Sequence, residues 1–167
     1  MIRVQREDFD PAEETNALVA NDHGIGGVVT FTGLVREIAD LGRHDVGSER
    51  RKERINGMTL EHYPGMTEKM LARIEAEALE RWPLSASLII HRYGDLEPGD
   101  RIVFVLTASA HRQAAYEANM FLVDWLKTKA PFWKREDAET GAHWVEARDS
   151  DDEAAARWSA SPPKAAE

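Results

Sequence analysis

The sequence contains no cysteine, and this absence excludes several kinds of chemistry together. Without cysteine a chain cannot form disulfides, thiolate metal sites or iron–sulfur clusters, and it has no cysteine nucleophile. The absence is also in keeping with a reducing compartment, where disulfides have no use. The first residues, Met1 to Asp8, include no apolar segment with a small-residue cleavage site, so the sequence predicts no export signal.

Long apolar runs and an excess of positive charge are missing as well. No stretch approaches the roughly 18 consecutive apolar residues that a membrane-spanning helix requires. The formal net charge is −9, whereas a general nucleic-acid binder needs an excess of Lys and Arg to neutralise phosphates. The 167 residues are 43% hydrophobic and 31% charged, which is typical of one folded domain. We therefore expect a cytoplasmic protein that binds neither nucleic acid nor membranes.

Strand-like and helix-like segments alternate along the chain without a regular β–α–β pattern. Short stretches rich in β-branched and aromatic residues predict strands at 2–5, 26–35, 58–63, 88–93, 102–108, 132–136 and 143–147. Apolar residues at helical spacing predict long helices at 66–82 and 111–129, and Asp10 followed by Pro11 predicts a shorter one. The expected fold class is α+β, as one domain over residues 1–150 with a mostly antiparallel sheet.

Two charged segments fall outside this pattern of elements. Residues 37–56 carry many charges and little hydrophobic period, so we expect a long exposed loop. That loop is either a disordered insertion or a lid over a pocket. Residues 151–167 begin with acidic residues and end with two consecutive prolines and small residues, which predicts a flexible tail.

Glycines and histidines give weaker signals. The glycines between Gly24 and Gly27 follow a predicted helix and precede a strand, whereas phosphate loops have the reverse order and end in Gly-Lys-Ser/Thr. A helix cap and a tight turn explain them better. The six histidines form no His-Glu-x-x-His pattern, so no metal site is predicted.

A candidate anion site lies where the strand 102–108 meets the helix 111–129. His111 and Arg112 stand at the start of that helix, where free backbone N–H groups favour an anion. An arginine there can hold a phosphate while the histidine transfers a proton. The alternative is a Ser109 cap with two solvated neighbours. Arg36, at the end of another predicted strand, is a further candidate. It supports an anion site only if its side chain faces the other basic residues.

The densest group of candidate residues lies between Lys127 and Glu136. Lys127 falls in the last turn of a helix, Pro131 forces a turn, and Lys134 then shares a strand face with Glu136. Two ammonium groups about 4 Å apart repel by roughly 4 kcal/mol at an effective dielectric near 20. Such a pair favours an anion between the cations, or a lysine that acts as base or nucleophile. The alternative is a solvated amphipathic edge.

Several of these segments together resemble one known family. These segments contain motifs that closely resemble those of the large, catalytic subunit of molybdopterin synthase, the MoaE family, and they occur in the same order along the chain as in that family. The resemblance runs from Gly26 to Arg148. Its motifs are Phe31–Arg36, Leu60–Met66, Ile90–Gly94, Ser109–Arg112, Leu126–Glu136 and Trp144–Arg148.

The resemblance implies a fold, a reaction and partners. Members have an α/β-hammerhead fold and convert cyclic pyranopterin monophosphate into molybdopterin by adding two sulfurs as a dithiolene. The sulfur arrives as a thiocarboxylate on the carboxy-terminal Gly-Gly of a small ubiquitin-like subunit. The large subunit typically forms a homodimer within a heterotetramer. No bound cofactor is implied, because the pterin is the substrate, and the sulfur carried by the partner agrees with the lack of cysteine.

The resemblance also implies roles for individual residues. The two functional lysines of the family fall on Lys127 and Lys134, which we expect to be catalytic. The residues expected to bind the substrate are Phe31, Arg36, His111, Arg112, Glu136 and Arg148. Two rival hypotheses remain: a non-catalytic adaptor that docks a ubiquitin-like tail, and another acyl or phosphoryl transferase with the same basic pocket.

Overall fold

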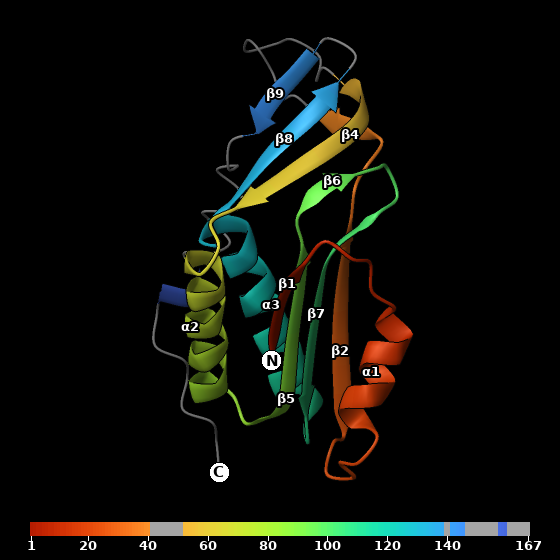
Figure 1. Cartoon of the computed structure of the whole chain (residues 1–167). Coiled ribbons are helices and arrows are strands. Elements are labelled where there is room, and N and C mark those ends of the chain that lie inside the picture. The colour runs from red at the N-terminus through yellow and green to blue at the C-terminus, as the bar shows by residue number, and fades with distance from the viewer. Residues whose placement is uncertain (41–51, 139–140, 146–156, 160–167) are drawn as a thin grey trace.

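The protein is built from two β-sheets that follow one another along the long axis of the molecule (Figure 1). The structure is a computed structural model that describes residues 1–40, 52–138, 141–145 and 157–159. The first sheet has the strand order β1-β5-β7-β2, and the second has the order β3-β4-β8-β9 with β6 also paired to β4. In chain order the elements are β1 (Ile2–Gln5), α1 (Pro11–Val19), β2 (Gly27–Leu34), β3 (Ile38–Asp40), β4 (Lys52–His62), α2 (Met66–Arg81), β5 (Leu84–Arg92), β6 (Gly94–Leu96), β7 (Arg101–Ser109), α3 (Arg112–Thr128), β8 (Phe132–Ala138), β9 (Gly141–Val145) and the 3₁₀ turn η1 (Arg157–Ser159).

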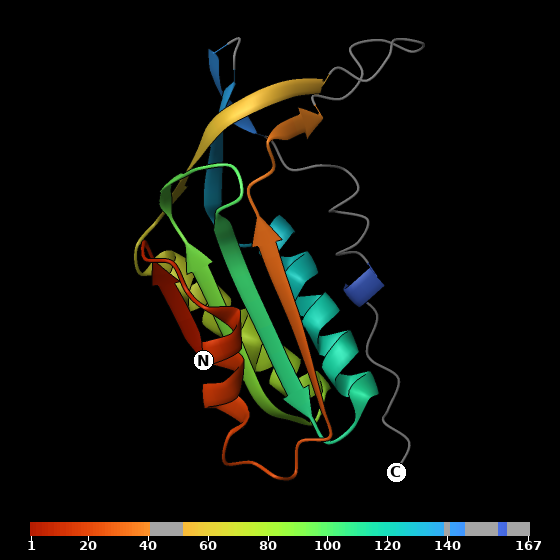
Figure 2. The same cartoon turned by 90° about the vertical axis from the view of Figure 1, so that its right-hand side faces the viewer.

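Helices cover both faces of the first sheet. Helices α2 and α3 lie on one face and α1 lies on the other (Figure 2). Along β7, Val105 points to α2 and α3, while Phe104 and Leu106 belong to the core on the α1 side. Both faces are therefore buried, and this explains why β7 reads as a continuous apolar run instead of an alternating one.

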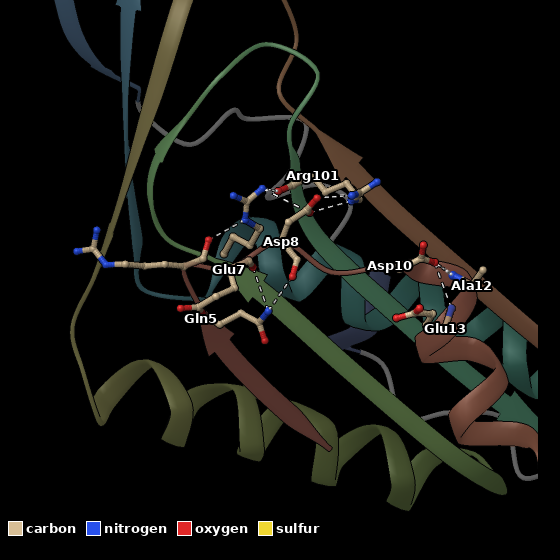
Figure 3. Close-up of polar contacts among 9 residues, drawn as sticks. Gln5, Glu7, Asp8, Asp10, Ala12, Glu13 and Arg101 are labelled. Carbon is tan, nitrogen blue, oxygen red and sulfur yellow. Dashed lines mark hydrogen bonds and ion pairs between the residues drawn. The ribbon is translucent and has the colours of Figure 1, made fainter.

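The helix ends follow local signals in the sequence. The Asp10 carboxylate accepts hydrogen bonds from the backbone N–H of Ala12 at 2.7 Å and of Glu13 at 3.1 Å, and Pro11 occupies the first helical position (Figure 3). Helix α3 ends at Thr128, three residues before Pro131. The chain then turns sharply, and the N–H of Phe132 donates to the Ala130 carbonyl at 2.8 Å. Strand β8 therefore starts directly beside the end of α3.

An ion-pair cluster fixes the connection between β1 and α1. Arg101 of β7 donates from Nε to the Asp8 carboxylate at 2.8 Å, and a second contact from Nη2 makes the pair bidentate (Figure 3). Arg92 of β5 lies 3.6 Å from the same carboxylate. The Arg101 guanidinium thereby holds the pKa of Asp8 below its usual value.

The second sheet has its own small core. Val35, Met58, Leu60 and Leu96 are buried together, with Ile102 packed against them. Strand β8 runs antiparallel to β4 with His62 opposite Phe132, Leu60 opposite Lys134 and Met58 opposite Glu136. Since paired residues share a sheet face, Lys134 and Glu136 project on the side of the buried Met58 and Leu60.

The predicted α+β class with a mostly antiparallel sheet and two long helices is confirmed, with α3 ending within one residue of the prediction. The β1–β5 pair is parallel.

The prediction of a loop over residues 37–56 is wrong at both ends. Ile38 pairs with Arg54 in an antiparallel ladder, and Ile55 is buried because the ladder carries it onto the core. The rest of that predicted loop, 41–51, lies outside the described residues.

The predicted flexible tail is also corrected in part, because η1 packs on the helices through Trp158. The remainder of the tail lies outside the described residues. Within the part of the chain that the structure describes, no helix is long and apolar enough to cross a membrane.

Candidate functional site

Lys127 stands in the last turn of α3, where the helix reaches the junction between the two sheets (Figure 1). Its side chain is exposed. Among the described residues, none of the hydrogen bonds or ion pairs involves its ammonium group. The negative end of the helix dipole favours a cation at this position. Lys127 is thus a charged group held on a rigid helix and open to an anionic ligand.

Lys134 differs from Lys127 because it has an acidic partner. Its ammonium group forms an ion pair with the carboxylate of Glu136, two residues further along β8. Glu136 is only 4% exposed, so its carboxylate is fixed by the surrounding structure. The pair leaves Lys134 less exposed and more rigidly placed than Lys127. Both lysines flank the tight turn at Pro131, which keeps them at the same end of the first sheet.

Arg36 and Phe31 differ in their place along β2. Phe31 is half-buried, packs against the core beneath α3 and pairs with Val105 in the middle of β7. Arg36 follows the end of β2 and is exposed. The preceding residue, Val35, is held by backbone hydrogen bonds to Gly99 and Asp100. Arg36 therefore leaves from a fixed point on the same side of the molecule as Lys127.

His111 and Arg112 lie at the opposite end of α3. His111 is the N-cap residue and Arg112 the first residue of the helix, and both side chains are exposed. With a rise of about 1.5 Å per residue, the backbones of Arg112 and Lys127 are about 22 Å apart along α3. A single chain does not bring these two predicted groups of site residues together.

Glycines allow β2 to run close to the start of α3. A Cβ on Gly26 would lie 2.2 Å from the carbonyl oxygen of Ala110, and one on Gly27 would lie 3.4 Å from the Cα of Arg112. The backbone N–H of Gly26 donates to the Ser109 carbonyl at 3.0 Å. The beginning of β2 is therefore beside Arg112, and the end of β2 leads to Arg36. Arg148 lies outside the described residues.

His91 of β5 and Phe132 of β8 form a ring stack that the sequence does not predict. The ring of His91 lies 3.6 Å from that of Phe132 with an interplanar angle of 14°, and its Nδ1 is 2.8 Å from the Arg92 carbonyl. Burial lowers the pKa of His91 to about 4, so the ring is neutral near pH 7. The signal in the sequence is the position of His91 directly after the apolar residues Leu88, Ile89 and Ile90, which are buried and make a charged side chain costly.

The fold agrees with what the comparisons with known proteins find. The sequence matches the MoaE protein family over residues 4–129. It is 57% identical to the molybdopterin synthase catalytic subunit of Pseudomonas aeruginosa, over 94% of this chain and 97% of the relative. The molybdopterin biosynthesis MoaE protein from Burkholderia ambifaria is a solved structure with 46% identity and a TM-score of 0.75, covering 95% of this chain and 97% of that chain.

A complex of subunits 1 and 2 of the molybdopterin-converting factor from Helicobacter pylori has a TM-score of 0.66 at 17% identity, covering 88% of this chain and 91% of that chain. At that identity the likeness shows the fold alone. Taken with the fold, the solved structures define the class: an α+β protein of the kind found in molybdopterin biosynthesis. The chain belongs to the MoaE family, whose curated relatives are catalytic subunits of molybdopterin synthase.

Proposed function

We propose that this chain transfers sulfur to cyclic pyranopterin monophosphate and so forms the dithiolene of molybdopterin. The sulfur is delivered as the carboxy-terminal thiocarboxylate of a small ubiquitin-like subunit ending in Gly-Gly. The observation that carries the proposal is Lys127, an exposed ammonium group on a rigid helix end with no acidic partner among the described residues. Both reactants are anions, and their approach requires such a cation.

The two lysines divide the work according to their surroundings. As a thiocarboxylate sulfur attacks a carbon of the pterin side chain, a C–S bond forms, a C–O bond at that carbon breaks, and negative charge develops near the reacting atoms. Water then cleaves the acyl–sulfur bond, which leaves the sulfur on the pterin and a carboxylate on the small subunit. Lys127 stabilises that charge or donates a proton, because its ammonium group is free to reach the substrate. Lys134, held by the buried Glu136, places a fixed positive charge that positions the substrate.

A second copy of the chain completes the site in this proposal. Strand β2 is an edge of the first sheet, and the α3 residues beside it include the exposed Tyr116 (61%) and Met120 (48%). A two-fold axis across this surface makes neighbouring elements antiparallel. The Arg112 end of one α3 then lies beside the Arg36 and Lys127 end of its partner. His111 and Arg112 in this arrangement bind the substrate phosphate in the partner's site, and two small subunits complete a heterotetramer.

Lys127→Ala tests the proposal, with Lys129→Ala as the matched control. Both residues are exposed lysines at the end of α3, but only Lys127 is assigned to the reaction. Dithiolene formation from the thiocarboxylated partner should fall by about 10²–10³-fold or more in Lys127→Ala and stay near wild type in Lys129→Ala. Both variants should still bind the partner.

Three results would count against the proposal, and the last two would favour the rival functions. Wild-type turnover in Lys127→Ala would remove this lysine from the reaction. A chain that binds the small partner but shows no turnover even as wild type would be an adaptor. Failure to bind the pterin precursor, with the fold intact, would favour another transferase.

A further inference from the structure

An acidic residue, Asp124, lies about one helical turn before Lys127 on α3. Its carboxylate is bound by two residues of the 3₁₀ turn η1. Asp124 is 12% exposed at its side chain. Its Oδ2 accepts a hydrogen bond from the indole Nε1 of Trp158 at 2.8 Å and forms an ion pair with Arg157 Nη2 at 2.9 Å. One carboxylate oxygen is therefore shared by two donors from η1.

The η1 turn is held in place by packing as well as by charge. The Trp158 ring lies edge-on to Trp82, the C-cap residue of α2, with centroids 5.8 Å apart, and edge-on to Phe121 of α3 at 5.6 Å. Edge-to-face aromatic contacts at these distances are favourable beyond simple area burial. Arg157 also reaches Met120, with Nη1 3.4 Å from the sulfur. The donors to Asp124 are thus fixed relative to α3.

Asp124 and Lys127 are close enough on α3 to pair with each other, so the contacts of η1 with Asp124 affect Lys127. Residues three apart on a helix are surface neighbours, and a carboxylate there pairs with a lysine. In the described structure the Asp124 carboxylate is taken by Arg157 and Trp158, and the Lys127 ammonium is in no ion pair. Without the two η1 donors, Asp124 would be the nearest acidic partner for Lys127 along the helix.

We propose that Arg157 and Trp158 are positioning residues that occupy Asp124 and thereby keep Lys127 available to anionic reactants. The inference rests on the proposed function only for the catalytic meaning of Lys127. The electrostatic relation between Asp124 and Lys127 can be measured without any turnover. Neither η1 residue touches the substrate in this account; both act through Asp124.

The test is a double variant, Arg157→Gln with Trp158→Phe, which removes the charge and the indole donor but keeps an aromatic ring in the Trp82–Phe121 contact. Trace acetylation of the folded full-length chain, read by mass spectrometry, compares Lys127 with Lys129 as internal control. The Lys127:Lys129 labelling ratio should fall about 1.4- to 2.3-fold, since an ion-paired amine reacts more slowly than a free one and a helix pair at this spacing contributes about 0.2–0.5 kcal/mol. Adding Asp124→Asn should restore the ratio.

Turnover with the thiocarboxylated partner is then measured on the same proteins. We expect a loss in the double variant and recovery when Asp124→Asn is added, which a purely structural role of η1 would not give. An unchanged labelling ratio, or a loss that Asp124→Asn does not restore, would overturn the inference. If labelling falls and recovers while turnover never changes, the relation between Asp124 and Lys127 stands and the proposed catalytic role of Lys127 fails.

Discussion

Mixed dimers offer a sharp test of where the substrate site lies. Arg112 and Lys127 are about 22 Å apart along one α3, a distance that no pair of side chains spans to hold one small substrate. If the site is shared across a two-fold axis, Arg112→Ala and Lys127→Ala damage different halves of it. Each variant alone should be nearly inactive, because both sites of its homodimer carry the lesion.

The expected recovery follows from counting sites. When equal amounts of the two variants are unfolded together and refolded, about half of the dimers are mixed, and each mixed dimer has one intact site. Dithiolene formation should therefore return to about one quarter of the wild-type rate. Lys127→Ala mixed with Lys134→Ala is the control, since both lesions affect the same half of the site and no intact site forms. Recovery in the control, or none in the test mixture, would refute the shared site.

Three further predictions concern stability. His91, whose pKa burial lowers to about 4, takes up protons in the unfolded chain below about pH 6.5. The free energy of unfolding should thus fall by about 3 kcal/mol between pH 6.5 and 4. His91→Phe, which keeps the ring stack on Phe132, should flatten that part of a urea-unfolding profile; an equally steep profile would contradict the assignment. Asp8, whose pKa the Arg101 guanidinium lowers, stabilises the fold above about pH 4 and loses this effect as the pH falls through its folded pKa. The urea midpoints of wild type and Asp8→Asn should differ at pH 7 and converge as the pH falls through the folded pKa of Asp8, and a constant difference would argue against the ion pair. Gly26→Ala places a methyl group 2.2 Å from the Ala110 oxygen and should cost about 1–3 kcal/mol. Gly24→Ala, which meets only the Asp22 side chain, should cost less in the same assay.

The elements that the sequence predicts well are those in which local signals and burial agree. Helix α3 has an apolar face at helical spacing and a proline after its end, and its predicted limits are within one residue of those observed. The sequence predicts a loop over 37–56 because β3 has only three residues and β4 begins with the charged residues Lys52, Glu53 and Arg54. The two strands owe their pairing to the backbone ladder that joins Ile38 to Arg54. Backbone pairing of this kind leaves no hydrophobic pattern to detect.

The site was predicted as a set of residues but not as an arrangement. Lys127 and Lys134 stand on either side of the turn at Pro131, and that much is local. The distance from Arg112 to Lys127 follows from the length of α3. It shows that the two residues of one chain cannot bind the same small substrate only after both have been assigned to that substrate. The contact of Trp158 with Asp124 joins residues 34 positions apart. It follows from tertiary packing, and the composition of the tail gives no sign of it.

The most direct measurement mixes the purified chain with cyclic pyranopterin monophosphate and a thiocarboxylated small subunit ending in Gly-Gly. Mass spectrometry of the pterin then follows the reaction. We predict a product that has gained two sulfurs, formed with wild-type protein and lost with Lys127→Ala. An unchanged pterin in the presence of wild-type chain bound to its thiocarboxylated partner would contradict the assignment of sulfur transfer to this protein.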